Sequence, residues 1–182
     1  MGRPMEEIVF ARETEVVLIP DGFPQLLPES TRGWITQVLG GNYTVQLETG
    51  RLVRVASADA DAIGQELVAV ASVDPNAPLT EDMVWSALRT IYDPEIPLNV
   101  VELGLIYGVD IRRDPGVAAQ VNVSMTLTAP GCGMGQVLAD DVDTKVRALP
   151  GVGQVAVELT FDPPWTPDRL SEEAKLELGM FY

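Results

Sequence analysis

Short alternating hydrophobic runs dominate residues 14–70, and tight turns rich in glycine, proline or asparagine separate them. Alternation of apolar and polar side chains places one face of a strand in a core. Glycine turns as short as these join neighbouring strands directly, so the pattern predicts a small antiparallel sheet or barrel. The predicted strands cover residues 16–19, 34–39, 43–47 and 51–55. We interpret residues 1–72 as a small β-rich N-terminal domain.

Two short stretches separate the predicted sheet from the rest of the chain. Residues 58–62 alternate alanine with aspartate, which predicts a strand end or a turn. We interpret Asp59 and Asp61 there as solvated caps and not as a metal site. Residues 73–79 contain two prolines and an asparagine, which is typical of a linker. We therefore place a second domain at residues 80–182.

A helical pattern replaces the strand pattern at the start of this second domain. Thr80 is a candidate N-cap, and Glu81 and Asp82 follow in the first turn, where the helix dipole favours acids. Apolar residues then recur at helical spacing as far as Ile91, and the pair Asp93-Pro94 ends the predicted helix.

The remaining periodicity predicts two strands, a helix, a third strand and a short terminal helix. The strands cover about 105–112, 120–127 and 152–161, with a hairpin turn at 114–116. The second helix follows a glycine-rich loop, and the terminal helix opens near Ser171. We expect an α+β domain of order α-β-β-α-β, with the sheet covered by helices and a helical tail. Core positions assigned to the second helix and third strand are Leu138, Val142, Val146, Leu149, Val155, Val157 and Leu159.

The charge of the chain restricts its partners. Its 27 acidic and 12 basic residues give a net charge of −15. Nucleic-acid binding requires clustered lysine and arginine, so no nucleic acid is expected as a partner, and no anionic membrane surface either. No apolar run is long enough for a membrane helix, and the start of the chain lacks the apolar segment of a signal peptide. We expect a soluble cytoplasmic protein.

The residue types that are missing exclude several chemistries. The chain has no histidine and one cysteine, Cys132. It therefore cannot form a Ser-His-Asp triad, a Cys-His pair, an imidazole metal site, an internal disulfide or a C-x-x-C zinc site. A soft-metal site at Cys132 would need ligands from a second chain, a small thiol or oxygen groups.

Cys132 lies in the loop Thr128-Ala129-Pro130-Gly131-Cys132-Gly133, between a predicted strand end and a predicted helix start. A helix N-terminus stabilises negative charge, so this position favours the thiolate. Gly131 and Gly133 remove side-chain bulk, which would let a cluster or a partner approach the backbone. Two interpretations stay open: a reactive or metal-binding thiol, and a small buried cysteine in a glycine turn. Thr128, at the strand end, is expected to bond the loop backbone.

Segment 93–104 is the second candidate. Asp93 and Glu95 bracket Pro94, and Pro97 stiffens the loop further. A rigid loop holds carboxylates for a metal or a partner at low entropic cost. The alternative is an ordinary helix stop with solvated acids. A third segment, 161–167, carries Trp165, which either docks a partner or closes the core beneath a rigid turn.

These motifs together resemble a known family. The runs Asp93-Pro94-Glu95-Ile96-Pro97 and Val101-Glu102-Leu103-Gly104-Leu105-Ile106-Tyr107, with the Thr128-to-Cys132 loop, are similar to the signature of small iron–sulfur maturation domains. That family includes the PaaD-type proteins and the eukaryotic cytosolic iron–sulfur targeting factors. The N-terminal β region and the turn Asp162-Pro163-Pro164-Trp165 resemble its long branch, called SufT, which accompanies the bacterial SUF assembly system.

The resemblance implies an accessory factor that helps to assemble iron–sulfur clusters or transfer them to recipient proteins, and not an enzyme. It implies Cys132 and Asp93 as metal-site residues, supported by Glu95, Thr128, Gly131 and Gly133. The implied partners are iron–sulfur assembly proteins and recipient apo-proteins, and a transient iron–sulfur cluster would be the cargo. One cysteine cannot hold a cluster, so binding would need a homodimer or a site shared with a partner. The alternatives are an adaptor that does not touch the cluster and, with less support, a cysteine-nucleophile enzyme.

Overall fold

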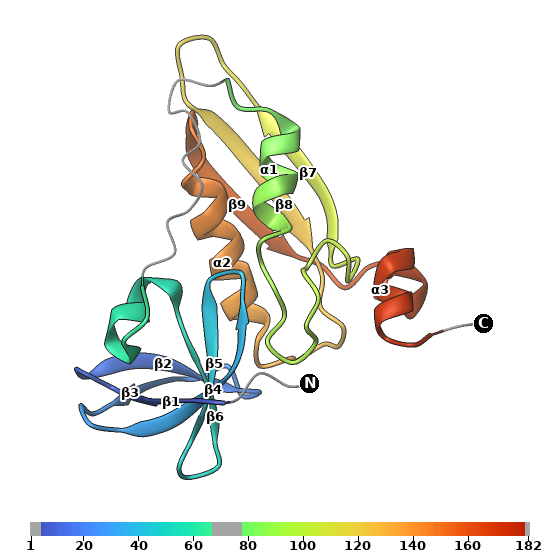
Figure 1. Ribbon diagram of the computed structural model, residues 1–182. Coiled ribbons are helices and arrows are strands. Elements are labelled where there is room, and N and C mark those ends of the chain that lie inside the picture. Colours follow the sequence, from blue (N-terminus) through green and yellow to red (C-terminus); the bar gives the residue numbers. More distant parts are fainter. Residues whose placement is uncertain (1–4, 67–77, 181–182) are drawn as a thin grey trace. The chain divides into compact units, whose positions relative to one another are not determined.

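The computed structural model describes residues 5–66 and 78–180, and the chain divides into two compact units, Met1–Ala71 and Ser72–Tyr182 (Figure 1). Most of the predicted linker, residues 73–77, lies outside the described residues. Each unit has its own cluster of buried apolar side chains.

The first unit is an antiparallel sheet of six strands in the order β1-β4-β5-β6-β2-β3 (Figure 1). The sequence pattern predicts β2, β4, β5 and β6 but neither β1 nor β3. Those two strands have four residues each, and β3 begins with a proline, so neither gives a clear alternating pattern. The strands are β1 (Glu6–Val9), β2 (Thr14–Ile19), β3 (Pro24–Leu27), β4 (Arg32–Leu39), β5 (Asn42–Leu47) and β6 (Leu52–Val55).

Residues Ser57–Ile63 form a short 3₁₀ helix with a kink at Asp59, where φ is −107° and ψ is 15°. Of the two alternatives predicted for 58–62, the strand end is therefore wrong and the turn is the closer one. The helix buries Ala60, Ala62 and Ile63 against the core of the sheet. Contact with the sheet selects the helical conformation here, and the alternation of alanine with aspartate does not reveal that contact.

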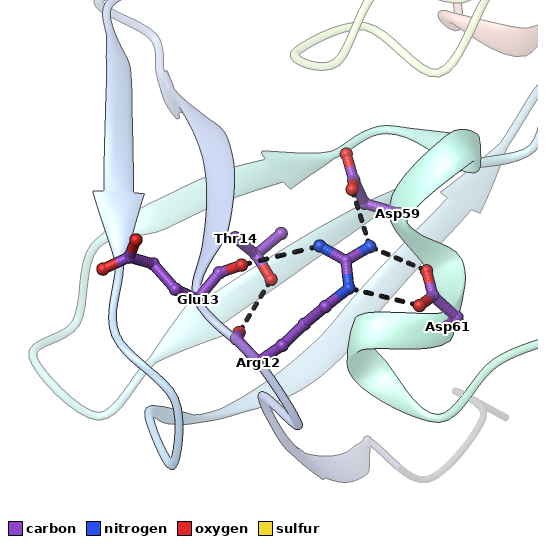
Figure 2. Close-up of polar contacts among 5 residues, drawn as sticks. All are labelled: Arg12, Glu13, Thr14, Asp59 and Asp61. Carbon is purple, nitrogen blue, oxygen red and sulfur yellow. Dashed lines mark hydrogen bonds and ion pairs between the residues drawn. The ribbon is translucent and has the colours of Figure 1, made fainter.

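The two aspartates of this helix bind Arg12, the residue that precedes Glu13 and β2 (Figure 2). The guanidinium donates to both carboxylate oxygens of Asp61, from Nε at 3.2 Å and from Nη2 at 2.9 Å. The same Nη2 donates to Asp59 at 2.9 Å. These hydrogen bonds hold the pKa of Asp61 below its usual range. Asp59 and Asp61 are accessible to solvent as predicted, but they act as ion-pair partners of Arg12 and not as caps, and so connect the helix to the sheet.

The second unit is a three-stranded sheet in the order β7-β8-β9, with helices packed on it (Figure 1). β7 and β8 are antiparallel, whereas β8 and β9 are parallel and α2 crosses between them. This arrangement confirms the predicted α+β class and the α-β-β-α-β order with a helical tail. The elements are α1 (Glu81–Leu88), β7 (Ile106–Arg112), β8 (Ala119–Met125), α2 (Gly135–Arg147), β9 (Val152–Leu159), a 3₁₀ turn (Pro167–Arg169) and α3 (Glu172–Glu177).

The helices cover one face of this sheet. Val121, Val123 and Met125 of β8 are fully buried in a core that also takes side chains from α1 and α2. The intervening residues of β8, such as Asn122 and Ser124, are partly exposed on the other face. Strand side chains alternate between faces, so the polar row marks a face that α1 and α2 leave open.

The element ends differ from the prediction in two places. Thr80 caps α1 as predicted, and its Oγ1 accepts a hydrogen bond from the Met83 N–H at 3.3 Å. However, α1 ends at Leu88, before the predicted stop at Asp93-Pro94, because the N–H groups of Thr90 and Ile91 bond back over three positions instead of four. Leu159, assigned to the core, is 38% exposed. None of the helices in the described residues has the length and apolar character needed to cross a membrane.

The segment that follows β9 folds back onto the start of β7. The Trp165 indole N–H donates to the Leu103 carbonyl at 2.8 Å, and Tyr107 Oη donates to the Pro163 carbonyl at 2.7 Å. The guanidinium of Arg169 stacks on the Tyr107 ring, 4.1 Å from its centroid. Trp165 is partly buried against the core, which favours its interpretation as a closing residue over an exposed docking residue.

Gly104 is the tightest point of this contact, and Gly104→Ala tests it. Its φ is +68°, and an added Cβ would overlap the carbonyl oxygen of Arg169. We expect a loss of about 2–4 kcal/mol from left-handed strain plus overlap. Gly116→Ala is the matched control, because its φ is +78° with nothing within 4 Å. It should lose only about 1 kcal/mol. Urea denaturation followed by tryptophan fluorescence measures both, and equal losses would contradict the close approach.

Candidate functional site

Three candidate segments leave the same end of the sheet in the second unit (Figure 1). Segment 93–104 precedes β7, the Cys132 loop follows β8, and the Pro-Pro-Trp turn follows β9. Because β7 is antiparallel to β8 and β9 is parallel to it, the start of β7 and the ends of β8 and β9 must lie together. Backbone hydrogen bonds join the strands at this end. The Thr126 N–H donates to the Leu105 carbonyl at 2.8 Å, and the Thr160 N–H donates to the Met125 carbonyl at 2.9 Å.

Asp93 is a buried carboxylate that organises its own loop. Its Oδ1 accepts hydrogen bonds from the Glu95 N–H at 2.7 Å and the Ile96 N–H at 3.0 Å. Asp93 is only 6% exposed, and its backbone N–H donates to the Leu98 carbonyl at 3.1 Å. An aspartate that bonds the backbone two and three residues ahead forms an Asx turn, which here holds the Pro94–Pro97 loop closed.

Asn99 forms a second Asx turn six residues later, and the sequence analysis did not single out this residue. Its Oδ1 accepts from the Val101 N–H at 3.1 Å and the Glu102 N–H at 3.0 Å. Asn99 is buried as well. The available signal was an asparagine placed, like Asp93, directly before a short turn, because Asx residues favour such turns. The loop is therefore held by two side chains of the same geometry.

Glu95 projects from this loop with a perturbed carboxyl group. Its residue is exposed at the surface, but the loop removes part of the water around the carboxyl. That desolvation, followed by repulsion from Asp93, raises the pKa of Glu95 above its usual value of 4.5. On this loop, the Asp93 carboxylate is bound inside and the Glu95 carboxyl faces outward.

The Cys132 loop is a tight turn that leads into α2. Cys132 N–H donates to the Ala129 carbonyl at 3.3 Å, and Gly135 N–H donates to the Cys132 carbonyl at 3.1 Å. Gly131 has φ +84° with open space around it, a conformation that other residues adopt only with strain. Cys132 itself is half-buried against the apolar core, and its thiol is free.

The first turn of α2 has no side-chain cap at its N-terminus. Uncapped N–H groups and the helix dipole together favour an anion beside them. No acidic residue lies in the first turn of α2 to satisfy them. Cys132 lies three residues before α2 begins, on the loop that leads to these N–H groups.

Two threonines flank the loop with different surroundings. Thr128 is half-buried, and its hydroxyl forms no hydrogen bond to the described residues, so the expected bond to the loop backbone is not found. Thr126 is fully buried, and its Oγ1 also has no partner among the described residues. Sequence reasoning did not single out Thr126.

The described residues contain no group of three or more histidine, cysteine, aspartate or glutamate side chains that could hold a metal ion. The structure places Cys132, Gly131, Gly133 and Thr128 on one loop and Asp93 with Glu95 on another, and the residues it describes do not form a complete ligand set. Any metal bound at Cys132 would need ligands from elsewhere.

Residues 81–159 match the family described as iron-sulfur cluster assembly protein. The chain is 51% identical over 100 residues to the Fe-S protein maturation auxiliary factor of Porphyromonas gingivalis, a match that covers 55% of this chain and 91% of that protein. It is 40% identical over 90 residues to the Fe-S protein maturation auxiliary factor SufT of Staphylococcus aureus, covering 50% and 98%. It is 35% identical over 100 residues to the Fe-S protein maturation auxiliary factor YitW of Bacillus subtilis, covering 55% and 94%.

These matches run through nearly the whole length of the relatives and about half of this chain. The chain therefore belongs to the iron–sulfur cluster assembly protein family, as its motifs predicted. The family match lies inside the second unit and includes both the Asp93 loop and the Cys132 loop.

Asp93→Ala tests the role of the buried carboxylate. Removing Oδ1 leaves two N–H groups without their acceptor, so we expect a loss of about 1–2 kcal/mol in the free energy of unfolding. Asp93→Asn keeps an oxygen at this position and should cost clearly less. Chemical denaturation measures both variants. Equal losses would mean that the negative charge, and not the hydrogen-bond geometry, stabilises the loop.

Glu95→Gln tests the raised pKa through the pH dependence of stability. The folded state holds the Glu95 proton more tightly than the unfolded state, so its contribution is complete below 4.5 and is lost as pH rises through the folded pKa. The variant should match the wild type below 4.5 and be the more stable of the two at neutral pH. Urea denaturation across this range measures the difference, and an unchanged or lower stability at neutral pH would contradict it.

Proposed function

We propose that this protein is an accessory factor that helps to place iron–sulfur clusters in recipient proteins, with the Cys132 thiolate as the point of contact with the cluster. The observation that carries the proposal is the position of the single cysteine. It lies on a glycine-rich turn, ahead of a helix N-terminus with no side-chain cap, in a chain whose relatives are named Fe-S protein maturation auxiliary factors.

Asp93 is proposed as the residue that orients the site. Its Oδ1 is already bound to two N–H groups, so its carboxylate shapes the loop that lies at the same end of the sheet as Cys132. Glu95, whose carboxyl faces outward, is the oxygen group better placed to reach a partner or a metal. Gly131 and Gly133 would leave room beside the thiol for the cluster.

A cluster held at Cys132 would be shared. Iron–sulfur clusters are usually bound by four ligands, whereas this chain has one thiol. The further ligands would come from a second copy of the chain, from a recipient protein or from a small thiol. An incomplete ligand set suits a donor, because a cluster that is not fully enclosed can pass to a recipient that supplies more cysteines.

The second candidate function is that of an adaptor, which does not bind the cluster itself. The lack of a three-residue ligand group in the described residues favours it directly, because an adaptor needs no ligand set. It would bind recipients and assembly proteins while the cluster travels on other components. Catalysis by Cys132 as a nucleophile is the weakest alternative, since the chain has no histidine to serve as its base.

Anaerobic reconstitution with ferrous iron and sulfide separates carrier from adaptor. We expect the wild type to gain the visible absorbance of a cluster together with the mass of a dimer, and Cys132→Ala to gain neither. Asp114→Asn is the control for iron bound loosely by carboxylates, because Asp114 lies in the β7–β8 turn at the other end of the sheet. It should behave as the wild type does.

The outcome also decides between the two functions. A cluster in the wild type that passes to apo-ferredoxin on mixing supports the carrier. If neither the wild type nor Cys132→Ala binds a cluster, the carrier is excluded and the adaptor is favoured. A cluster retained by Cys132→Ala would move the site away from the cysteine.

A further inference from the structure

The two edge strands of the sheet in the second unit differ in how well they are protected against pairing with another chain. Both edge strands carry a bulge, β7 between Ile106 and Gly108 and β9 at Gly153, near its start. β7 also carries an ion pair that joins Asp110 to Arg112 at 3.0 Å. Bulges and charges are devices that keep an edge strand from pairing with another chain. β9 has eight residues with no proline and no lysine, and Glu158 is its one charged side chain. Within the described residues, no strand pairs with the outer edge of β9.

A groove of about 400 Å³ runs between this edge and helix α2. We call it the α2–β9 groove, and it is lined by Gln136, Ala139, Asp140, Asp143, Val157 and Leu159. Val157 and Leu159 form an apolar floor, and the aspartates stand along the helix. Leu159 is 38% exposed, and Phe161, just past the end of the strand, is 41% exposed. Large apolar side chains exposed along an unpaired edge mark a surface suited to a partner.

The side chains on the two faces of β9 decide which side chains an added strand must carry. Val157 and Leu159 point to the helix face, whereas Glu158 points to the open face, where its cross-strand neighbour on β8 is Ser124. Side chains of a strand placed beside β9 would alternate in the same way. Those on the helix face would meet the apolar floor, and those on the open face would meet Glu158.

The α2–β9 groove also leads to the cysteine loop. Gln136, the second residue of α2, lines the groove together with Leu159, the last residue of β9. Cys132 lies four residues before Gln136, on the loop that opens α2. A segment bound along β9 would therefore have one end beside the Cys132 loop.

We propose that the outer edge of β9, with the α2–β9 groove, binds an extended segment of the recipient protein in which apolar and basic side chains alternate. The segment adds a fourth strand to the sheet through backbone hydrogen bonds, as in β-strand addition generally. This proposal rests on the proposed function, because it supplies the contact that holds a recipient beside Cys132.

A second copy of the chain is the less suitable occupant. A parallel in-register pair of two β9 strands would place Glu158 opposite its equivalent, and a fully overlapping antiparallel pair would place it opposite Gly153. Neither arrangement gives Glu158 an opposite charge, in a chain whose net charge is −15. Like charges placed opposite each other on neighbouring strands are destabilising. A basic segment forms favourable pairs at the same positions.

The binding test uses the full-length protein and synthetic peptides of eight residues, the length of β9. A peptide of alternating valine and lysine should bind, as measured by fluorescence anisotropy. The same peptide with alternate backbone nitrogens methylated should lose at least about tenfold in affinity, since it cannot form the ladder. A valine–glutamate peptide should also bind at least about tenfold more weakly. Equal binding of the three peptides would overturn the proposal, and so would no binding of the valine–lysine peptide.

Two variants locate the peptide on the protein. Leu159→Lys should weaken the valine–lysine peptide at least about tenfold by placing a charge on the apolar floor. Glu158→Lys should weaken that peptide and strengthen the valine–glutamate peptide, a reversal that general unfolding cannot produce. Val117→Lys is the control, because Val117 is 67% exposed in the β7–β8 turn. It should leave both affinities unchanged, and the absence of a reversal with Glu158→Lys would exclude the β9 edge.

Disulfide exchange with the single cysteine measures the direction in which a peptide binds along the α2–β9 groove. A peptide with a pyridyl-disulfide cysteine at one end exchanges with the Cys132 thiolate, which forms a protein–peptide disulfide and releases pyridine-2-thiol. One of the two end-labelled peptides should react at least about tenfold faster than the other, because only one end lies beside Cys132. Equal rates would contradict the placement.

Failure of this proposal differs from failure of the proposed function. If Leu159→Lys abolishes peptide binding but transfers clusters to a recipient as well as the wild type, the docking surface is wrong and the carrier function stands. If peptide binding follows the predictions and no cluster is ever bound, the docking surface stands and supports the adaptor.

Discussion

The central strand β8 is the element on which the candidate site depends. It pairs with β7 in one direction and with β9 in the other, and this mixed pairing alone brings three separate segments to one end of the sheet. The hydrogen bond from Thr126 to Leu105 then joins the Cys132 loop to the end of the Asp93 loop. A parallel pair requires a crossover helix, so the chain must leave β8 through a turn and enter α2 there. Cys132 lies on that obligatory turn.

Asx turns explain why the neighbouring loop can be rigid without regular structure. Asp93 and Asn99 each satisfy two backbone N–H groups that would otherwise be left without partners. Gly104 then lets the segment after β9 approach closely enough for Trp165 to bond Leu103. The Oδ1 atoms of Asp93 and Asn99 are thus already hydrogen-bonded within the loop. The Cys132 thiol is free and the Glu95 carboxyl faces outward, so the described contacts leave both of these groups available to a partner.

Local patterns succeeded where the structure is governed by neighbours in sequence. Thr80 and Ser171 cap their helices because each bonds an N–H three residues ahead, a rule that needs no tertiary information. Local patterns failed where distant residues decide. The 3₁₀ helix at Ser57–Ile63 packs on the sheet and forms an ion pair with Arg12. Strand β3 is defined by its pairing with β2.

For this protein, the sequence by itself determined the class of the second unit, the order of its elements, the absence of histidine and the single thiol. Those properties follow from composition and from periodicities that each segment carries alone. Only the tertiary structure decided that Asp93 is bound inside its loop, that three motifs meet at one end of a sheet and that no strand of the described residues pairs with the outer edge of β9. Each of these depends on pairing between segments far apart in the chain, and the period of one segment carries no information about its partner.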